Sequence, residues 1–178
     1  LENVTLADAL KPPTWSMGAK ITVDSASLMN KGLEVIEAVH LFSTPADKIE
    51  VLVHRQSIIH SAVELSDGAV IAQLGVPDMK LPIQYALFYP DRLPMPGKKL
   101  NLFEAGTLTF EEPDTVRFPS LDYAREAIRK GGVAGAVMNA ANEVLVYKFL
   151  EKRISYKDIY RYVAKAVEEH DLISAPTL

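Results

Sequence analysis

The residues of this chain with the clearest capacity for chemistry lie between positions 24 and 34. Four of them carry polar groups of four kinds: the Ser25 hydroxyl, the Asn30 amide, the Lys31 ammonium group and the Glu34 carboxylate. In a helix that turns about 100° per residue, Asn30, Glu34 and Lys31 share one arc of the circumference. Because most of the remaining circumference is apolar, this arc must face a partner, a cavity or a ligand.

The chemistry of this arc suggests two ligands. A helix N-terminus offers free N–H groups and a partial positive charge, which suit a phosphate. Lys31 would add a positive charge, and Ser25 and Asn30 would add uncharged donors. Glu34 would repel a phosphate, so a hard divalent cation is its natural ligand. The alternative is a capped structural helix with an internal Lys31–Glu34 pair, and the arc alone does not decide between the two.

The segment before this arc must set its position. Residues 20–23 (Lys-Ile-Thr-Val) predict a short strand that feeds through Asp24 and Ser25 into the helix. Aspartate and serine at such a junction are typical N-caps, since their oxygens accept hydrogen bonds from the first helical turn. The apolar spacing predicts that the helix runs to about Phe42.

A strand-rich block follows. Residues 49–53 read as a buried strand, and residues 61–65 and 69–74 flank Ser66-Asp67-Gly68. An Asp-Gly pair between two apolar runs is a strong hairpin signal. Together with residues 20–23, these segments predict a small, mostly antiparallel sheet.

The second half of the chain is predicted to be mainly helical. The expected elements are a helix over 79–89, a proline-rich connecting arm over 90–113 with a short strand at 107–110, and helices over 121–130, 134–152 and 156–169. Three short-linked helices favour a bundle, and residues 174–177 resemble the lead-in to a further helix, so a truncated bundle is one alternative. We therefore expect an α+β fold, with a catalytic α/β domain at 1–112 that holds a flap loop, the hairpin and the arm, and a helical domain at 113–178.

Composition excludes several classes of protein. The 178 residues carry a net charge of −4, and the basic residues are scattered, which argues against a nucleic-acid partner. There is no cysteine, so a disulfide framework and a thiolate nucleophile are excluded. No apolar run reaches membrane-spanning length and no signal-peptide pattern is present, so we expect a soluble intracellular protein without a membrane partner.

Two further groups of residues have open interpretations. Trp15 lies in a loop with two prolines, where it would serve as a lid over a pocket or as an anchor to the core. His54 and His60 follow the predicted strand at 49–53, and an imidazole there would ligate a metal, move a proton or form a structural hydrogen bond. We expect no site role for His40 or His170.

Several of these segments resemble one enzyme family, the 1-deoxy-D-xylulose 5-phosphate reductoisomerases. The match is specific because the segments are long, follow the family's order and cover almost the whole chain. The matching segments are residues 13–18 (Pro-Thr-Trp-Ser-Met-Gly), 24–38 (Asp-Ser-Ala-Ser-Leu-Met-Asn-Lys-Gly-Leu-Glu-Val-Ile-Glu-Ala), 56–61 (Gln-Ser-Ile-Ile-His-Ser), 74–79 (Leu-Gly-Val-Pro-Asp-Met) and 139–143 (Asn-Ala-Ala-Asn-Glu).

The resemblance implies an enzyme of the non-mevalonate route to isoprenoids. Such an enzyme converts 1-deoxy-D-xylulose 5-phosphate to 2-C-methyl-D-erythritol 4-phosphate with NADPH and Mg²⁺, Mn²⁺ or Co²⁺. The family fold combines an N-terminal NADPH domain, a catalytic domain with the homodimer interface, and a C-terminal helical bundle. Its members are expected in the bacterial cytoplasm or the plastid stroma.

The resemblance also assigns roles to residues of this chain. It implies that Glu34 is a metal ligand and catalytic carboxylate, and that His60 is an active-site histidine. The other matched residues are expected to bind substrate or cofactor: Ser25, Asn30 and Lys31 the substrate phosphate, Trp15 the substrate as the flap aromatic, and Met79 the pocket on the cofactor side.

The chain also departs from the family pattern. It holds no glycine-rich dinucleotide loop, and we expect the NADPH domain, two further metal-binding acids and another phosphate-binding serine to lie upstream of Leu1. Pro12 stands where the family usually has histidine, and Arg55 where it usually has proline. We therefore expect the isolated chain to be inactive. As alternatives, it would be a non-catalytic dimerising fragment or a phosphate-sugar binding module.

Overall fold

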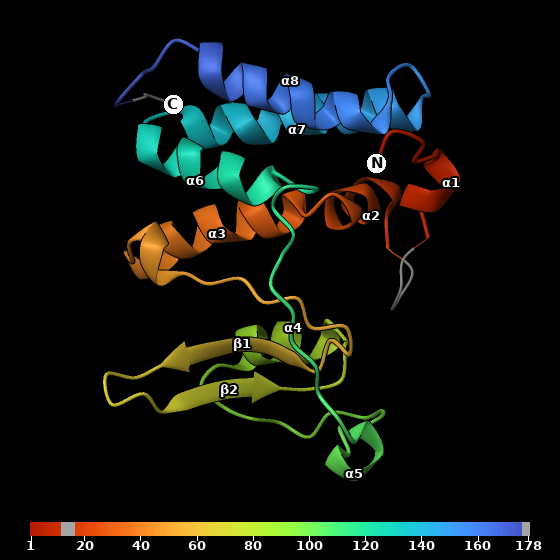
Figure 1. Ribbon diagram of the computed structural model, residues 1–178. Helices are drawn as coiled ribbons and strands as arrows, with labels where there is room; N and C mark the ends of the chain where they lie inside the picture. The colour runs from red at the N-terminus through yellow and green to blue at the C-terminus, as the bar shows by residue number, and fades with distance from the viewer. Residues whose placement is uncertain (12–16, 176–178) are drawn as a thin grey trace. The chain divides into compact units, whose positions relative to one another are not determined.

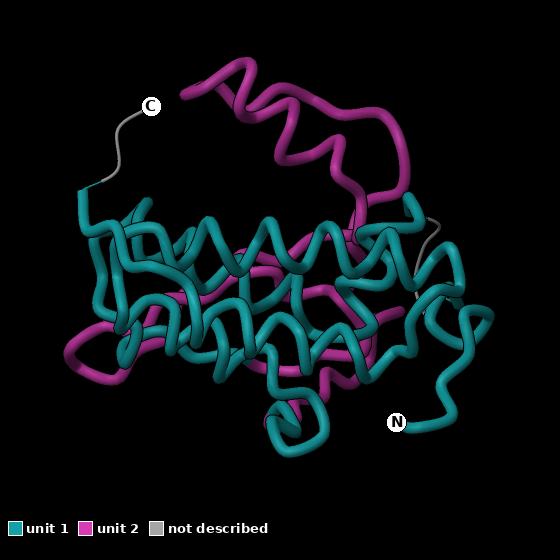
Figure 2. Tube along the Cα trace, turned by 90° about the horizontal axis from the view of Figure 1, so that it is seen from above, with its two compact units in different colours: residues 1–51, 113–178 teal, residues 52–112 magenta. Residues whose placement is uncertain are grey.

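The computed structural model describes residues 1–11 and 17–175, which form two compact units (Figures 1 and 2). Unit 1 contains residues 1–51 and 113–178, and unit 2 contains residues 52–112. In unit 1, residues 1–51 pack against the C-terminal helices. The expected division into domains at 1–112 and 113–178 stays a prediction.

Unit 1 is built from helices that enclose one apolar core. Figure 1 shows α6 between α3 and the pair formed by α7 and α8. Fully buried core side chains come from every long helix, among them Met29 of α3, Met138 of α7 and Ile159 of α8. The helical elements are α1 (Leu6–Ala9), α2 (Ala19–Ala26), α3 (Met29–Phe42), the 3₁₀ turn η1 (Ala46–Lys48), α6 (Ser120–Lys130), α7 (Ala134–Leu150) and α8 (Tyr156–Glu169).

The three C-terminal helices confirm the prediction from periodicity to within two residues at each end. Gly131 ends α6 with a φ of 71°, a left-handed value that costs glycine little. A capping box begins α8, in which the Ser155 hydroxyl accepts from the Asp158 amide and the Asp158 carboxylate accepts from the Ser155 amide. These local signals are strong because each satisfies backbone groups within its own segment.

The predicted strand over residues 20–23 is wrong, because this segment lies within α2. Val23 is fully buried in the core, and the Thr22 hydroxyl donates to the Gly18 carbonyl oxygen one turn earlier, at 2.9 Å. Burial of one helix face therefore outweighs the preference of a β-branched run for extended backbone.

The predicted start of the next helix is also wrong. Asp24 and Ser25 belong to the last turn of α2, and α3 begins only at Met29. Leu28 separates the two helices with φ 57° and ψ 11°, an unusual left-handed conformation for a leucine. The predicted end at Phe42 is confirmed.

Unit 2 contains the predicted hairpin. Strands β1 (Ile59–Glu64) and β2 (Val70–Leu74) pair antiparallel, with Val63 opposite Ile71, and Gly68 takes a φ of 84° in the turn. The predicted helix after it is confirmed as α4 (Lys80–Phe88), and a short α5 (Leu102–Ala105) lies in the connecting arm. The expected α+β class is thus confirmed.

Two of the predicted strands do not form. Of residues 49–53 and 107–110, only Val53 takes part in strand-like pairing, as an isolated bridge to Glu111. The described residues therefore hold a two-stranded sheet. An apolar run reads as a strand in isolation, but a ladder needs a neighbouring strand of matching length, and neither segment has one within the described residues.

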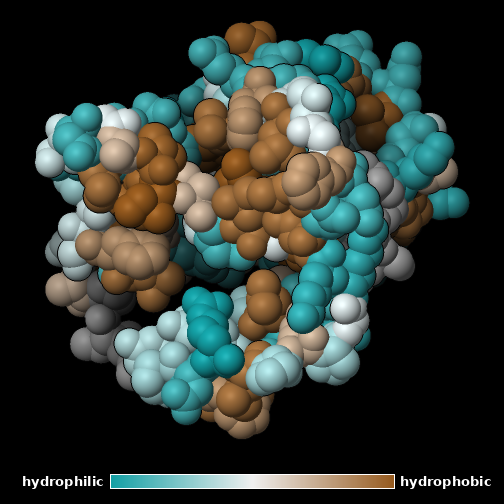
Figure 3. Space-filling model, turned by 90° about the horizontal axis from the view of Figure 1, so that it is seen from below, coloured by the Kyte–Doolittle hydropathy of each residue, from teal (hydrophilic) through white to brown (hydrophobic). Residues whose placement is uncertain are grey.

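Unit 2 leaves much of its apolar surface exposed. Val63, Val70 and Ile71 of the hairpin are each more than 60% exposed, and Leu87 of α4 is 76% exposed. Figure 3 shows apolar side chains gathered into broad patches on one face of the molecule. Exposed apolar surface of this kind is typical of a face that another protein segment covers.

Gly32 allows α3 and α6 to approach closely. A Cβ atom at position 32 would lie 2.9 Å from the Ser120 carbonyl oxygen and 3.2 Å from the Ala124 Cβ. The first separation is shorter than real Cβ contacts, and the clash is with backbone that cannot move freely. Gly135 of α7 differs, because a Cβ there would meet Ile36 at an ordinary 3.5 Å.

Replacing each of these two glycines by alanine should change the free energy of unfolding in opposite directions. Gly32→Ala should lower the free energy of unfolding by about 1–3 kcal/mol, the usual cost of overpacking. Gly135→Ala should raise it by about 0.5–1 kcal/mol, since alanine loses less backbone freedom than glycine on folding into a helix. Urea unfolding of the full-length protein followed by circular dichroism measures both, and equal effects of the two variants would contradict the close α3–α6 packing.

Candidate functional site

The three residues predicted to share an arc of α3 lie together in the structure. Glu34 accepts hydrogen bonds from the other two. The Asn30 side-chain amide donates to Glu34 Oε1 at 2.6 Å, and the Lys31 ammonium group donates to Glu34 Oε2 at 2.5 Å. The Lys31 and Glu34 side chains are 43% and 44% exposed. The arc is therefore formed and open to ligands.

The exposure of this ion pair limits its structural value. Exposed pairs contribute roughly 0–1 kcal/mol, because water screens the charges and both long side chains lose freedom. The structure thus contains the i,i+3 Lys31–Glu34 pair of the alternative interpretation, but the pair contributes little to the stability of the fold. The same groups can exchange these internal contacts for contacts with a ligand.

Ser25 lies in the last turn of α2, four residues before α3 begins. Its side chain is exposed, and its carbonyl oxygen accepts from the Leu28 amide at 3.2 Å in the turn between the helices. The Met29 amide donates to the Ser27 hydroxyl oxygen at 3.4 Å. The first turn of α3 therefore follows directly from the last turn of α2, and N–H groups of a first turn lack intrahelical acceptors.

The described residues do not form a complete site for a divalent cation. No group of three or more histidine, aspartate or glutamate side chains in residues 1–11 and 17–175 could hold a metal ion. Mg²⁺ requires close to six oxygen ligands, of which proteins commonly supply one or two carboxylates. A carboxylate such as that of Glu34 is suited to be one ligand of such an ion.

A buried polar network connects the last turn of α2 to α7. The Asp24 side chain is 2% exposed, and its Oδ2 pairs with the Lys20 ammonium group at 2.7 Å. Its Oδ1 accepts from the side-chain amide of Asn142, a fully buried residue of α7, at 2.8 Å. A buried carboxylate needs such partners, since an unpaired charge in a core is strongly unfavourable.

The same network holds the backbone at the helix break. The Ser27 carbonyl oxygen accepts from the Ser120 hydroxyl at 2.9 Å and from the Tyr160 hydroxyl at 3.3 Å. Burial raises the pKa of Tyr160, and the neighbouring Tyr156 hydroxyl raises it further. Tyr160 therefore stays neutral, and its single hydroxyl proton is shared between the Ser27 carbonyl oxygen and the Tyr156 hydroxyl, which lies 3.2 Å away.

The remaining described site residues belong to unit 2. His60 lies at the start of β1 and is exposed, and its Nε2 lies 3.9 Å from where a Cβ on Gly75 would be. Met79 precedes α4 and is 58% exposed. Trp15 and Pro12 lie outside the described residues.

The segment before His60 is tied to the connecting arm. The His54 Nδ1 lies 2.8 Å from the Thr109 carbonyl oxygen, and its ring stacks on Phe110. Arg55 donates to both carboxylate oxygens of Glu111, at 2.6 and 3.0 Å, and this hydrogen bonding holds the pKa of Glu111 below its usual range. His54 and Arg55 thus have structural contacts.

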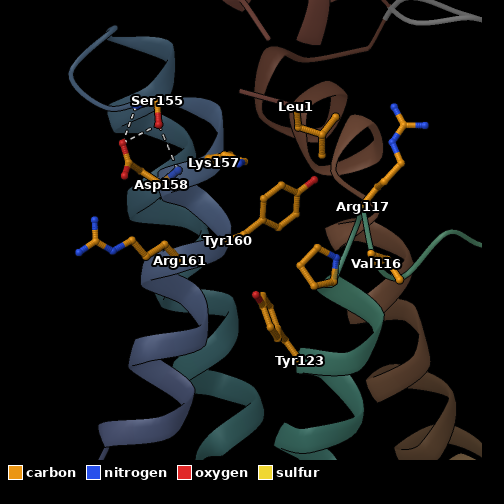
Figure 4. A pocket seen from close by; sticks show the side chains of 10 residues that line it. Leu1, Val116, Arg117, Tyr123, Ser155, Lys157, Asp158, Tyr160 and Arg161 are labelled. Carbon is orange, nitrogen blue, oxygen red and sulfur yellow. Dashed lines mark hydrogen bonds between the residues drawn. The ribbon is translucent and has the colours of Figure 1, made fainter. Parts of the chain in front are cut away.

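A cavity of about 530 Å³ opens elsewhere in unit 1 (Figure 4). None of the predicted site residues lines it. Arg117, Tyr123, Lys157, Tyr160 and Arg161 lie around it, and Lys157 pairs with Glu2. Tyr160 links this cavity to the helix break, because its ring lines the cavity while its hydroxyl reaches Ser27.

The sequence alone does not reveal the contact between Asp24 and Asn142. It predicts an N-cap role for Asp24 and includes Asn142 only in the segment at 139–143. Their contact spans 118 positions in the sequence. The one available signal was the pair of asparagines within a strongly apolar helix, where an amide needs a buried partner.

Two family models match most of the chain. One, described as the DXP reductoisomerase C-terminal domain, matches residues 74–178. The other, described as the 1-deoxy-D-xylulose 5-phosphate reductoisomerase C-terminal domain, matches residues 1–42. Between them they include the arc of α3, Met79 and the C-terminal helices.

Curated relatives carry the same description. A 1-deoxy-D-xylulose 5-phosphate reductoisomerase of Bacillus cereus (strain AH187) is 56% identical over 179 residues, which cover 100% of this chain and 47% of the relative. One from Chlorobium chlorochromatii (strain CaD3) is 59% identical over 171 residues, covering 96% and 45%. The chain thus spans about half the length of the curated relatives it matches.

Solved structures agree with the fold. A crystal structure of DOX-P reductoisomerase in complex with NADPH, fosmidomycin and magnesium matches with a TM-score of 0.90 and 45% identity, over 94% of this chain and 41% of that one. The Zymomonas mobilis enzyme in complex with NADPH matches with the same score and identity, over 99% and 45%. Among the described residues of this chain, no helix has the length and apolar character needed to cross a membrane.

Proposed function

This chain belongs to the 1-deoxy-D-xylulose 5-phosphate reductoisomerase family, and on that premise we propose that the whole protein containing it, called the parent protein below, is such an enzyme. It would convert 1-deoxy-D-xylulose 5-phosphate to 2-C-methyl-D-erythritol 4-phosphate in isoprenoid biosynthesis. The observation that carries the proposal is the open arc of Asn30, Lys31 and Glu34 at the first turns of α3.

In this proposal the arc and Ser25 hold the substrate phosphate. Lys31 supplies the positive charge, Asn30 and Ser25 supply donors, and the helix N-terminus supplies N–H groups and a partial positive charge. Anchoring the phosphate fixes one end of a small flexible sugar and so orients its reacting carbons. When the phosphate binds, Asn30 and Lys31 turn from Glu34 towards it.

Glu34 is then free for a second role, as one ligand of the divalent cation. The other ligands would come from parts of the parent protein outside this chain, because the described residues hold no group of three or more histidine, aspartate or glutamate side chains that could bind a metal ion. Mg²⁺, Mn²⁺ and Co²⁺ are all candidates, and the cation would stabilise negative charge on substrate oxygens. A solved relative whose description includes magnesium supports the proposal.

NADPH is the proposed cofactor and would supply the hydride that reduces the rearranged aldehyde. Relatives solved with NADPH support this proposal. We propose that Met79 contacts the cofactor side of the pocket, that His60 is an active-site histidine, and that Trp15 closes over the substrate to limit the access of water. The domain that holds most of the cofactor would lie outside this chain.

The isolated chain has a different proposed behaviour. With one metal-binding carboxylate and no dinucleotide-binding loop, it should not turn over substrate. It would act as a dimerising fragment or as a phosphate-sugar binding module. The open arc favours the second of these, since Ser25, Asn30 and Lys31 all belong to this chain and only one further phosphate-binding serine is expected upstream of it.

We also propose that the parent protein is a homodimer of the bacterial cytoplasm or the plastid stroma. The exposed apolar side chains of the β1–β2 hairpin support the dimer, because surface of this kind is costly to leave in water. The unpaired outer edges of a two-stranded sheet also favour pairing with another chain. The bacterial origin of the relatives supports the first location.

The two charged residues of the arc should affect catalysis differently. In the parent protein, Lys31→Ala should raise KM for the substrate by 10-fold or more (about 1.4 kcal/mol or more of lost binding) with a smaller change in kcat, because phosphate is held in ground and transition states alike. Glu34→Gln should mainly lower kcat and weaken the affinity for Mn²⁺. Steady-state oxidation of NADPH at varied substrate and Mn²⁺ measures both.

The control for these variants is stability. Since the Lys31–Glu34 pair is more than 40% exposed, both variants should unfold within about 0.5 kcal/mol of the wild type. A parent protein that oxidises no NADPH with substrate and Mn²⁺ would refute the proposed function. A Lys31 variant impaired only in kcat, with a Glu34 variant impaired only in KM, would refute the role assignment.

The proposed dimer can be tested at the centre of the hairpin. Ile71→Asp should convert the parent protein to a monomer, because the substitution places a charge among apolar side chains of the proposed interface. Ser66→Asp, which adds the same charge in the turn, should leave the dimer intact. Light scattering coupled to size exclusion reports the mass, and a monomeric wild type or a dimeric Ile71→Asp variant would contradict the proposal.

A further inference from the structure

Asn142 is a buried amide with an unexpected combination of contacts. Its side chain is fully buried in unit 1, and its Nδ2 donates to Asp24 Oδ1 at 2.8 Å. Its own Oδ1 has no hydrogen-bond partner among the described residues. A buried amide oxygen without a partner costs stability, and the donor that Asn142 supplies to the buried Asp24 carboxylate offsets part of that cost. What Asp24 holds in place therefore decides what the Asn142 contact does.

The only side chain that the Asn142 amide contacts by a hydrogen bond in the described residues is that of Asp24, which directly precedes Ser25. Asp24 occupies the last turn of α2, the turn that also carries Ser25. The hydrogen bond that holds Asp24 against α7 therefore also fixes the orientation of the adjacent Ser25 side chain.

The other side of the same turn is held in a comparable way. The Ser27 carbonyl oxygen accepts from Ser120 of α6 and Tyr160 of α8, so three C-terminal helices grip residues 24–27. Leu28 then takes a left-handed conformation and α3 begins at once. The gripped turn sets where α3 starts and thereby where Asn30 and Lys31 lie relative to Ser25.

We propose that Asn142 is a positioning residue for phosphate binding, which acts through Asp24 to hold Ser25 in register with Asn30 and Lys31. This inference rests on the proposed function, since it assumes that these three side chains bind the phosphate. Asn142 itself is buried and does not touch the ligand. Its effect is transmitted by one hydrogen bond.

The hydrogen bond from Asn142 orients the Asp24 side chain and is not needed to balance its charge. The charge of Asp24 is already balanced by Lys20 at 2.7 Å, on its other oxygen. The contact with Asn142 therefore needs only an acceptor at Oδ1. An asparagine at position 24 retains such an acceptor, whereas an alanine does not.

The test measures the affinity of the parent protein for inorganic phosphate and for NADPH by titration calorimetry, together with KM for the substrate. Asn142→Ala should weaken phosphate binding and raise KM about tenfold, the change expected for one lost hydrogen bond. Its affinity for NADPH should not change. Asn139→Ala, which alters an exposed asparagine one turn earlier in α7, is the matched control and should behave as the wild type.

Further variants at positions 142 and 24 distinguish a role in positioning Ser25 from a role in folding. Asn142→Leu keeps the side-chain volume and removes the amide, so it should fold and still show the weakened phosphate binding. Asp24→Asn, which keeps an acceptor for Asn142 but turns its NH2 group towards the Lys20 ammonium, should retain more phosphate affinity than Asp24→Ala, which should lose affinity as Asn142→Ala does. A general structural role would instead lower the unfolding temperature of these variants and leave the affinity of the folded protein unchanged.

The outcomes distinguish this inference from the proposed function. A parent protein that turns over substrate, but whose Asn142→Leu variant binds phosphate as the wild type does, overturns the inference alone. A parent protein without turnover, whose phosphate affinity falls in the Asn142 variants, overturns the enzyme assignment and supports the inference. A parent protein that neither turns over substrate nor binds phosphate overturns both.

Discussion

The break between α2 and α3 is the feature on which the rest of unit 1 depends. A chain that leaves one helix at Ala26 and enters another at Met29 must place a non-glycine residue in a left-handed conformation, and Leu28 does so. Such a conformation costs free energy and persists where neighbouring contacts determine it. Those contacts come from the far end of the sequence: the Ser27 carbonyl oxygen is held by Ser120 and Tyr160.

This constraint connects the core to the surface. The C-terminal helices bury an apolar core, and their few buried polar groups are used mainly at the helix break. Gly32 then allows α3 to lie close against α6, which fixes one face of the helix and leaves the opposite face open. The open face carries Asn30, Lys31 and Glu34, whose mutual contacts are weak enough to be exchanged for a ligand. A preorganised binding site requires a rigidly packed helix face and, opposite it, exposed side chains that can adjust to a ligand.

Sequence reasoning succeeded where a short segment determines its own structure. The arc of α3 follows from helical spacing, the hairpin from Asp67-Gly68 between two apolar runs, and α8 from its capping box. It failed for residues 20–23, because the burial that makes them helical depends on segments more than 100 positions away. The role of Asn142 was hidden for the same reason. The resemblance to known enzymes identified the family, but spacing alone left the arc undecided between a site and a structural helix.

The central claim is that the turn gripped by the C-terminal helices presents the first turn of α3 to a phosphate. Hydrogen–deuterium exchange of the parent protein, with and without inorganic phosphate, tests this claim most directly. The account predicts that phosphate slows exchange at the amides of Asn30 and Lys31 and leaves the amides of β1 and β2 unchanged. Unchanged exchange at the start of α3, or protection found only in unit 2, would contradict it.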